Sequence, residues 1–263
     1  MPGTDIQKAK ELLDKGELVA IPTETVYGLA ACATNPEAVV KIFRAKERPF
    51  FDPLISHFRD FEQVMEWLPE MPGKARKLAG KFWPGSLTMI LPKSDRIPDL
   101  VTSGMDHMGV RIPRHPLTQS LLQLLDYPIA APSANPFGYV SPTTAKHVED
   151  QLGERISYVL DGGACEVGVE STIVSFRNES SPAILRYGGI SKEDIEAVIG
   201  PVQEDLNKSS NPEAPGQLKK HYSPSTRFIL SENLEKTMAE VSSDKLAVLH
   251  FNGSGLDDQI GRA

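Results

Sequence analysis

The stretch ELVAIPTETVYGL, residues 17–29, joins an apolar run to a polar loop. Residues 17–22 are predicted to form a buried strand, because short apolar runs bounded by turn residues are typical of one. The loop that follows carries several hydroxyl groups and one carboxylate. Ligands of open α/β sheets bind at the carboxyl ends of strands, so these side chains are candidates for a binding site. A plain polar turn, in which Gly28 supplies a positive φ, explains the same residues, and this stretch alone leaves both interpretations open.

Helices and strands are predicted to alternate outward from this stretch over residues 1–200. Predicted helices lie at 5–15, 36–46, 60–68, 72–82, 116–125, 142–152 and 191–199. Predicted strands lie at 17–22, 54–57, 86–92, 109–112, 128–131, 157–161, 171–176 and 183–187. Thr4 is expected to cap the first helix, Gly16 to end it, and Asn35 to cap the second. This alternation is typical of an α/β domain.

The chain changes character after residue 200. Residues 201–225 are polar, contain four prolines and few aliphatic side chains, and are predicted to be a linker. Residues 226–263 carry one strand-helix-strand pattern, with the helix expected near 232–241. A single unit of this kind does not bury both faces of its own sheet. We therefore expect residues 226–263 to be the start of an incomplete second domain with a Rossmann-like α/β fold.

Charge and composition argue against several classes of protein. The 263 residues carry a formal net charge of −7, which disfavours a protein that coats nucleic acid, although a local basic cleft is compatible with it. The sequence has no run of about 18 apolar residues and its N-terminus is polar, so neither a transmembrane helix nor a signal peptide is expected. We therefore expect a cytoplasmic protein without membrane contact. The two cysteines predict neither a disulfide framework nor a structural zinc site.

Three basic residues and one histidine stand where a ligand could meet them. Lys46 and Arg48 follow the predicted helix 36–46, where they either complement the helix dipole or clamp a phosphate. Arg111 lies in the apolar strand GVRI, and a buried guanidinium needs a partner such as a substrate carboxylate. His57 lies on another predicted strand, where a structural, hydrogen-bonded role is the more common one.

Further polar clusters border apolar strands. Ser133 and Asn135 come directly after one predicted strand, VESTI (169–173) borders another, and Arg186 ends a third. Each cluster alone fits a turn, but several at strand ends are best explained by one shared pocket. Neither the phosphate-loop pattern GxxxxGK[ST] nor GxGxxG is present. A nucleotide site in this chain would therefore follow another design.

Nine motifs occur in order over about residues 5–200: PTETVYGLA, FRAKERP, DPLISH, FWPGSLTMIL, VRIP, IAAPSAN, LDGG, GVESTI and ILRYGG. Together they closely resemble the YrdC-like threonylcarbamoyl-AMP synthase family. The segment APGQLKKHYSP resembles the linker between the two domains in the longer branch of that family. The resemblance implies a twisted mixed sheet with flanking helices around a concave cleft, and a linker that folds over the active site.

The resemblance also implies an activity. In this family L-threonine, bicarbonate or CO2, and ATP yield L-threonylcarbamoyl-AMP and pyrophosphate, with Mg²⁺ on the phosphates. The expected enzyme is a nucleotidyltransferase whose product feeds threonylcarbamoyl modification of the adenosine beside the tRNA anticodon. The expected partner is a downstream tRNA threonylcarbamoyl-transfer complex, and direct nucleic-acid binding is expected to be weak or absent. Physically, the reaction needs positioning, charge neutralisation and exclusion of water.

Site residues are carried over from the motif matches, and none is assigned to the metal. The residues expected around threonine are Thr25, His57, Arg111, Ala131 and Ser171. Arg111 would take the threonine carboxylate, and Lys46 and Arg48 would be the catalytic pair that holds triphosphate or bicarbonate charge. The other residues expected to contact ATP or the adenylate are Asp52, His107, Ser133, Asn135, Ser141, Arg186, Lys219 and His221. His221, on the linker, would close over the nucleotide as part of a lid.

Three positions depart from the family pattern. Asp52 stands where asparagine is common before Pro-Leu-Ile, and its negative charge near phosphates needs compensation by a metal ion or by Lys46. Lys219 replaces a stacking tyrosine of the linker, so a contact there would become ionic. His107 stands where threonine is common.

Two other functions are compatible with the resemblance. The same fold occurs as one domain of hydrogenase-maturation carbamoyltransferases, which also carry zinc-finger-like and acylphosphatase-like regions that are not evident in this sequence. An RNA-binding module is the non-enzymatic alternative, and the acidic net charge argues against it as the main role.

Overall fold

The computed structural model describes residues 2–206, 212–217, 229–231 and 233–240. Contacts between residues divide the chain into two units, 1–224 and 225–263, each described by itself. In the second unit, helix α9 (Leu234–Glu240) forms where a helix is expected. Residues 229–231 of the first expected strand are not in a strand, and the second expected strand lies outside the described residues.

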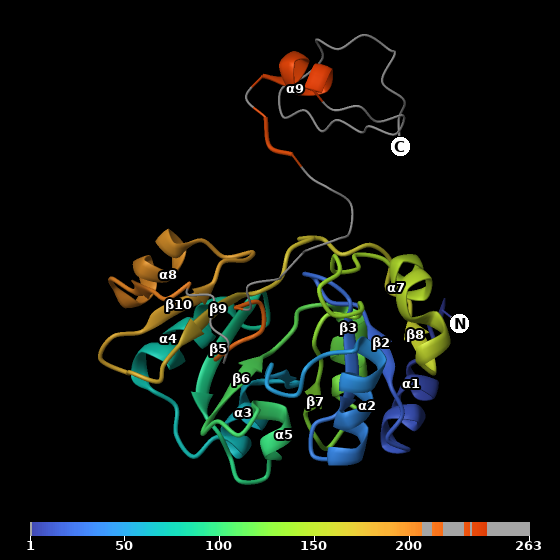
Figure 1. The fold of residues 1–263 in the computed structure, drawn as a ribbon. Helices are drawn as coiled ribbons and strands as arrows, with labels where there is room; N and C mark the ends of the chain where they lie inside the picture. Colours follow the sequence, from blue (N-terminus) through green and yellow to red (C-terminus); the bar gives the residue numbers. More distant parts are fainter. Residues whose placement is uncertain (1, 207–211, 218–228, 232, 241–263) are drawn as a thin grey trace. The chain divides into compact units, whose positions relative to one another are not determined.

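The first unit alternates helices with strands, as the sequence predicts (Figure 1). Its helices are α1 (Ile6–Asp14), α2 (Pro36–Lys46), α3 (Phe61–Trp67), α4 (Gly73–Phe82), α5 (Asp99–Thr102), α6 (Pro116–Leu122), α7 (Ala145–Leu152) and α8 (Lys192–Ile199). Its strands are β1 (Pro2–Gly3), β2 (Val19–Ile21), β3 (Gly28–Cys32), β4 (Ile55–His57), β5 (Leu87–Pro92), β6 (His107–Arg111), β7 (Ile129–Ala130), β8 (Tyr158–Leu160), β9 (Thr172–Ser175), β10 (Ala183–Arg186) and β11 (Gln203–Glu204). The short helix α5, strand β3 and the two-residue strands β1 and β11 are not among the predicted elements.

The strands of the first unit form one mixed sheet in the order β1-β8-β2-β3-β7-β4-β6-β5-β9-β10-β11. Strand β4 runs parallel to β6 and antiparallel to β7, and β5 runs antiparallel to β6 and parallel to β9. In this register His57 lies opposite Arg111, at the ends of β4 and β6. The predicted α/β class with a mixed sheet and flanking helices is therefore confirmed.

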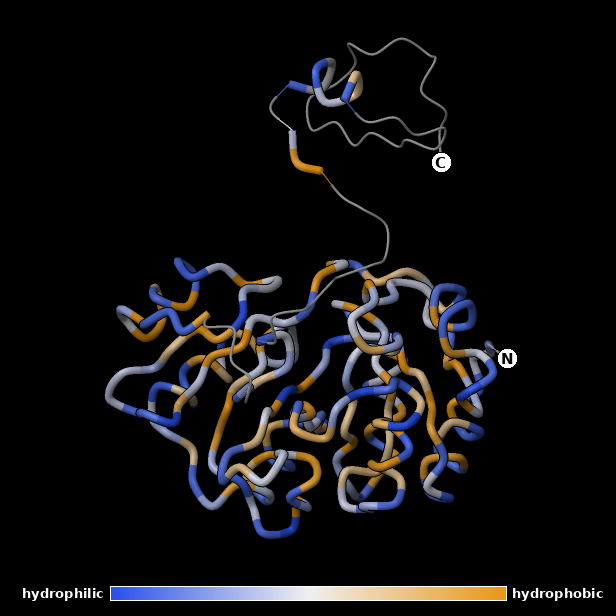
Figure 2. Tube along the Cα trace, viewed as in Figure 1, coloured by the Kyte–Doolittle hydropathy of each residue, from blue (hydrophilic) through white to orange (hydrophobic). Residues whose placement is uncertain are grey.

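Apolar clusters cover both faces of the sheet. On β2, Val19 and Ile21 pack with residues of α1 and α6, whereas Ala20 belongs to the larger cluster with α2, α3, α4, α7 and α8. Successive side chains of a strand point to opposite faces, so a strand covered on both faces is a continuous apolar run. Figure 2 shows this as apolar colour along the strands. Within the described residues, no helix has the length and apolar character needed to cross a lipid bilayer.

Helix α2 begins where the sequence predicts. The side-chain oxygen of Asn35 accepts hydrogen bonds from two amides of the first turn, at 3.0 and 3.3 Å. Eleven residues later the helix ends at Lys46, which directs that side chain toward the candidate site. The cap of α1 is Asp5 rather than the predicted Thr4, because the Asp5 carboxylate accepts the Lys8 amide at 3.0 Å.

Gly28 has a different role from the predicted one. It begins strand β3, antiparallel to β2 with Ile21 opposite Gly28, and its φ is not positive. A Cβ atom at this position would lie 3.3 Å from Cβ of Ala131 and 3.6 Å from the carbonyl oxygen of Pro132. Glycine therefore accommodates the close approach of the segment after β7 and does not serve a turn. This approach brings that segment beside the loop after β2.

Candidate active site

A cavity lies at the ends of the central strands. It is lined by the loop after β2, the start of β3, the end of α2 and its following loop, the ends of β4, β6 and β10, the segments after β7 and before β9, and part of the segment 212–217. The lining residues are Thr23, Val26, Gly28, Lys46, Arg48, Asp52, Ile55, His57, Arg111, Ala131, Pro132, Ser133, Asn135, Phe137, Gly138, Tyr139, Glu170, Ser171, Arg186, Pro215 and Gly216.

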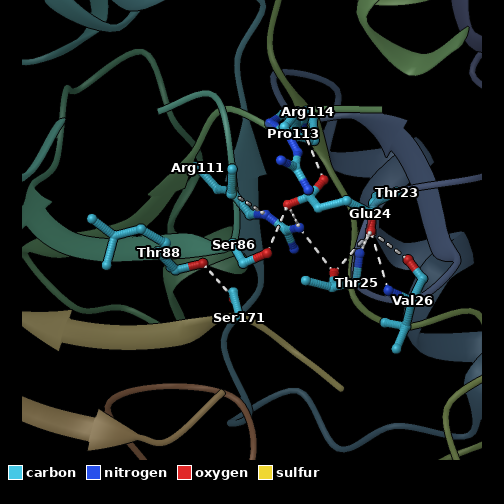
Figure 3. A network of polar contacts seen from close by, with 12 residues as sticks. Thr23, Glu24, Thr25, Val26, Ser86, Thr88, Arg111, Pro113, Arg114 and Ser171 are labelled. Atoms are coloured by element: carbon cyan, nitrogen blue, oxygen red, sulfur yellow. Dashed lines mark hydrogen bonds and ion pairs between the residues drawn. The ribbon is translucent and has the colours of Figure 1, made fainter. Parts of the chain in front are cut away.

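A buried ion pair beside the cavity joins Arg111 to Glu24 (Figure 3). Nη2 of Arg111 lies 2.6 Å from Oε1 of Glu24, and the two side chains are 5% and 3% exposed. The same nitrogen donates to Oγ1 of Thr25 at 2.9 Å, and Nε of Arg111 donates to the carbonyl oxygen of Gly85 at 3.3 Å. The partner that the sequence requires for a buried guanidinium is thus a carboxylate of the protein itself. Among the described residues, Nη1 is the guanidinium nitrogen without a hydrogen-bond partner.

The protein fills the hydrogen-bonding capacity of the Glu24 carboxylate. Oε1 also accepts from Oγ of Ser86 at 3.3 Å, and Oε2 accepts from the amide of Arg114 at 2.9 Å. Burial pushes the pKa of Glu24 upward, but the Arg111 guanidinium and the Arg114 amide outweigh it and hold the pKa below its ordinary value. Glu24 therefore stays ionised and fixes Arg111 in position.

Lys46 is held between two backbone carbonyl groups. The residue is 1% exposed, and Nζ donates to the carbonyl oxygens of Ser133 and Asn135 at 2.5 Å each. Burial, and then the charge of Arg48, lower the pKa of Lys46 well below its ordinary value. The two carbonyl groups favour the protonated form, and the third N–H of the ammonium group is available to a ligand.

Arg48 is fastened to the loop that follows it. Its Nη2 lies 2.9 Å from Oδ2 of Asp52 and donates to the carbonyl oxygen of Pro53 at 2.8 Å, while Nε donates to the carbonyl oxygen of Asp52 at 3.1 Å. The side chains of Arg48 and Asp52 are 6% and 3% exposed. Compensation of the Asp52 charge, expected from Lys46 or a metal ion, therefore comes first from Arg48.

Arg186 links the end of β10 to the segment before β9. Its Nε and Nη2 donate to the carbonyl oxygen and to Oγ of Ser171, each at 3.1 Å. Nη1 donates to the carbonyl oxygen of Pro215 at 3.2 Å, and the Ser171 hydroxyl also lies 2.7 Å from Oγ1 of Thr88. Burial lowers the pKa of Arg186 to about 10, so the side chain remains a cation at neutral pH.

His57 is neutral. It is 2% exposed, and Nδ1 lies 3.1 Å from the carbonyl oxygen of Ile55. Because a carbonyl oxygen only accepts, Nδ1 carries the proton and Nε2 is an acceptor. Burial, together with the charge of Arg111, lowers the pKa of His57 to about 3. At neutral pH this side chain can therefore accept a hydrogen bond from a ligand but cannot supply a positive charge.

Most of the predicted site residues come together in the cavity. Those in the lining are Lys46, Arg48, Asp52, His57, Arg111, Ala131, Ser133, Asn135, Ser171 and Arg186. Thr25 lies next to the lining, through its bond to Arg111. Ser141 reaches the cavity through Glu170, because its hydroxyl donates to Oε1 of Glu170 at 2.6 Å.

His107 is the predicted residue that the structure does not bring to the cavity. It begins β6, four residues before Arg111, which places it about 13 Å away along an extended strand. At the end of β6 opposite to Arg111, Nδ1 of His107 lies 2.7 Å from Oδ1 of the neighbouring Asp106. The nucleotide contact expected of His107 stays a prediction, because position in a motif does not say which end of a strand faces the cavity. Lys219 and His221 lie outside the described residues.

Sequence reasoning assigned no role to Glu24, Thr23 or Glu170. Oγ1 of Thr23 lies 2.8 Å from Oγ1 of Thr25 and donates to the carbonyl oxygen of Val26 at 2.6 Å, which shapes the loop. The signal for Glu24 was available, because a buried arginine in an apolar strand needs an anion and Glu24 is the carboxylate of the first motif. No such signal marked Glu170.

The fold and site define an α/β protein whose cavity at the strand ends is rich in cationic side chains, a lining suited to small anions. Two family models match this chain. The Sua5/YciO/YrdC family, described as "Telomere recombination", matches residues 11–188, and "Threonylcarbamoyl-AMP synthase, C-terminal domain" matches residues 190–259. The chain therefore belongs to the Sua5/YciO/YrdC family, and the resemblance inferred from the motifs is confirmed.

Individual relatives agree with this membership. Proteins named threonylcarbamoyl-AMP synthase from Bacillus subtilis and Pyrococcus abyssi are 46% and 45% identical, each over 86% of this chain. These matches cover 66% and 68% of the two relatives, so the chain spans about two thirds of their length. The crystal structure of P. abyssi Sua5 complexed with L-threonine superposes with a TM-score of 0.82 at 42% identity, over 86% of this chain and 69% of that one.

We predict that replacing Glu24 destabilises the fold through Arg111. Glu24→Ala leaves a buried guanidinium without its counter-ion, which costs about 3–5 kcal/mol in the free energy of unfolding. The matched control is Glu166→Ala, because Glu166 pairs with Arg114 at 2.8 Å but is 71% exposed. A surface pair of this kind contributes at most about 1 kcal/mol. Urea unfolding of both variants measures the difference, and equal losses would contradict a special role for the buried pair.

We predict that His57 makes the fold sensitive to acid. Its pKa is about 3 in the folded chain and near 6.5 when exposed, so between these values the unfolded chain binds the additional proton. The free energy of unfolding then falls as the pH drops from 6.5 toward 3, by at most about 1.4 kcal/mol per pH unit. His57→Gln should show a shallower decline in urea unfolding across this range. The exposed His147→Gln should retain the slope of the parent chain, and an unchanged slope in His57→Gln would refute the assignment.

Proposed function

We propose that this chain synthesises L-threonylcarbamoyl-AMP from L-threonine, bicarbonate or CO2, and ATP, with release of pyrophosphate. The observation that carries the proposal is the gathering of two separate groups of cations in one cavity. Arg111 lies on one side with a neutral histidine and hydroxyl groups, and Lys46 and Arg48 lie at the end of α2. A substrate with one carboxylate and another with several phosphates would each find a matching group.

The amino-acid substrate would bind around Arg111. Its carboxylate would meet Nη1 of Arg111, while Nη2 is held by Glu24 and Thr25. The acceptor nitrogen of His57 would receive a hydrogen bond from the substrate hydroxyl or amine. Ala131, a small residue of the lining, leaves room for the amino acid. Ser171, which also contacts Arg186, would border both substrates.

The phosphates would bind between Lys46, Arg48 and Arg186. Each of these side chains is already oriented by bonds to the protein, so little reorganisation is needed when charge develops on the leaving pyrophosphate. Ser133 and Asn135 would contact the nucleotide from the segment after β7. No nucleophilic side chain is required, because the chain would act by placing the carbamate oxygen in line with the α-phosphorus.

Mg²⁺ is the proposed metal ion of the reaction. Among the described residues, no three His, Cys, Asp or Glu side chains group as ligands of one ion, so a resident all-protein metal site is not formed there. The lining nevertheless offers two oxygens without a partner, Oδ1 of Asp52 and Oδ1 of Asn135. Carboxylate and amide oxygens combined with substrate phosphates are a usual coordination of Mg²⁺. When bound, the ion would neutralise phosphate charge.

Exclusion of water is the remaining requirement, because the mixed anhydride hydrolyses readily. Pro215 and Gly216 belong to the lining, and Ala214 beside them is fully buried against Ile55 and Leu185. This segment would anchor a cover over the adenylate. The product would pass to a tRNA threonylcarbamoyl-transfer complex, and we propose the cytoplasm as the place of both reactions.

The proposal is tested by measuring pyrophosphate. The chain incubated with ATP, bicarbonate and L-threonine should release pyrophosphate, and omission of either L-threonine or bicarbonate should abolish the release. The adenylate should appear in equal amount by mass spectrometry. Release of pyrophosphate that does not depend on threonine, or no release at all, would contradict the proposal.

We predict that Arg111→Lys raises the KM for threonine and leaves the KM for ATP nearly unchanged. Lysine keeps the charge and the ion pair with Glu24 but lacks the second nitrogen that would meet the threonine carboxylate. The KM for threonine should rise by about tenfold or more, as expected for the loss of one charge-assisted hydrogen bond. The KM for ATP should stay within about twofold. Initial-rate measurements decide this, and a larger effect on ATP would show that Arg111 belongs to the phosphate side.

A further inference from the structure

Asp52 is a carboxylate placed among cations of a site proposed for phosphates. Its closest charged partner is Arg48, and the charges of Lys46 and Arg186 also act on it. Burial raises the pKa of Asp52, although these three cations pull it downward. A negative charge at this position opposes a bound polyphosphate unless another cation enters with it.

The two oxygens of Asp52 differ in their contacts. Oδ2 lies 2.9 Å from Nη2 of Arg48, whereas Oδ1 is buried and has no hydrogen-bond partner in the part of the chain that the structure describes. Desolvating half of a carboxylate without a partner is costly, so such an atom in a native fold calls for a partner, either an ordered water or a bound cation. Because Asp52 belongs to the cavity lining, that ligand would enter through the cavity.

A second unpartnered oxygen lines the same cavity. Nδ2 of Asn135 donates to the carbonyl oxygens of Pro136 and Tyr139, at 2.9 and 2.8 Å. These two acceptors fix the orientation of the amide, since a flipped amide would set oxygen against oxygen. Oδ1 of Asn135 is therefore an acceptor, and it has no partner within the described residues. Asn135 is connected to the cation group through its carbonyl oxygen, which accepts from Lys46.

A cation suits these oxygens better than the phosphate groups of the nucleotide do. Phosphate oxygens only accept, so they offer nothing to a carboxylate or to an amide oxygen. A divalent ion held by phosphates would offer its positive charge to both. Free Mg²⁺ would be repelled by Lys46, Arg48 and Arg186, so the ion should arrive only together with the polyphosphate.

We propose that Oδ1 of Asp52 binds the divalent cation that enters with the nucleotide, and that Oδ1 of Asn135, from the same lining, is a second protein oxygen available to it. The inference rests on the proposed use of ATP. Nucleotide binding by this chain would then depend on Mg²⁺ through Asp52. Asparagine at the same position would supply a neutral oxygen and would weaken that dependence.

The test is the affinity for the non-hydrolysable α,β-methylene-ATP, measured by titration calorimetry with Mg²⁺ and with EDTA. In the parent chain, removal of Mg²⁺ should weaken binding at least about tenfold more than it does in Asp52→Asn. The control is Asp106→Asn, which removes the same charge from a side chain that is 78% exposed and outside the lining, and which should behave like the parent chain. Mg²⁺ alone should give no binding heat with the parent chain.

The calorimetric results distinguish the role of Asp52 from the use of ATP itself. An equal loss on Mg²⁺ removal in the parent chain and Asp52→Asn would overturn the role of Asp52 and leave the proposed function standing. No nucleotide binding under any condition would overturn both. Thermal unfolding checks that Asp52→Asn is folded. A second probe needs no variant: exchange-inert tetraamminecobalt(III)–ATP lacks free coordination sites, so it should bind the parent chain about tenfold more weakly than MgATP, and equal binding would refute direct contact.

Discussion

The buried pair of Arg111 and Glu24 is the constraint on which the rest of the site depends. Neither charge is tolerated in the interior alone, so the end of β6 and the loop after β2 have to meet. Through Ser86 and the Arg114 amide, the same carboxylate also holds the segments before β5 and after β6. One ion pair thus connects the segments that form one wall of the cavity, and the orientation of Arg111 follows from the fold itself.

The part of the lining at the end of α2 compensates its buried charges differently. Lys46 is compensated by two carbonyl oxygens and Arg48 by the loop that follows it, so neither is neutralised by a fully engaged carboxylate as Arg111 is. Because of this difference, the two groups of cations favour different ligands. Arg111, already paired, favours a ligand that matches its free edge, whereas Lys46 retains a net charge that favours anions of high charge density.

Much of this was predictable from sequence, and the failures have physical reasons. Apolar periodicity located the long strands and α2, and a buried arginine in GVRI correctly required an anion. Strand β3 was missed because Gly28 suggested a turn, whereas its missing side chain serves a contact with Ala131, which is more than 100 residues away. The same limit applies to Glu170, which lines the cavity without having been predicted, and to His107, which lies outside the lining. Motif matches select residues along the chain, but only the strand register decides which end of β6 faces the cavity.

The distribution of charge also separates the proposed function from RNA binding. The chain carries a formal net charge of −7, yet the cavity concentrates Lys46, Arg48 and Arg111, which are 1%, 9% and 4% exposed. Cations that bind a nucleic-acid backbone lie on the surface, where a polymer of phosphates can reach them. Cations this deeply buried are accessible only to an anion small enough to enter the cavity. The burial that makes these side chains costly to the fold is therefore what restricts them to small substrates.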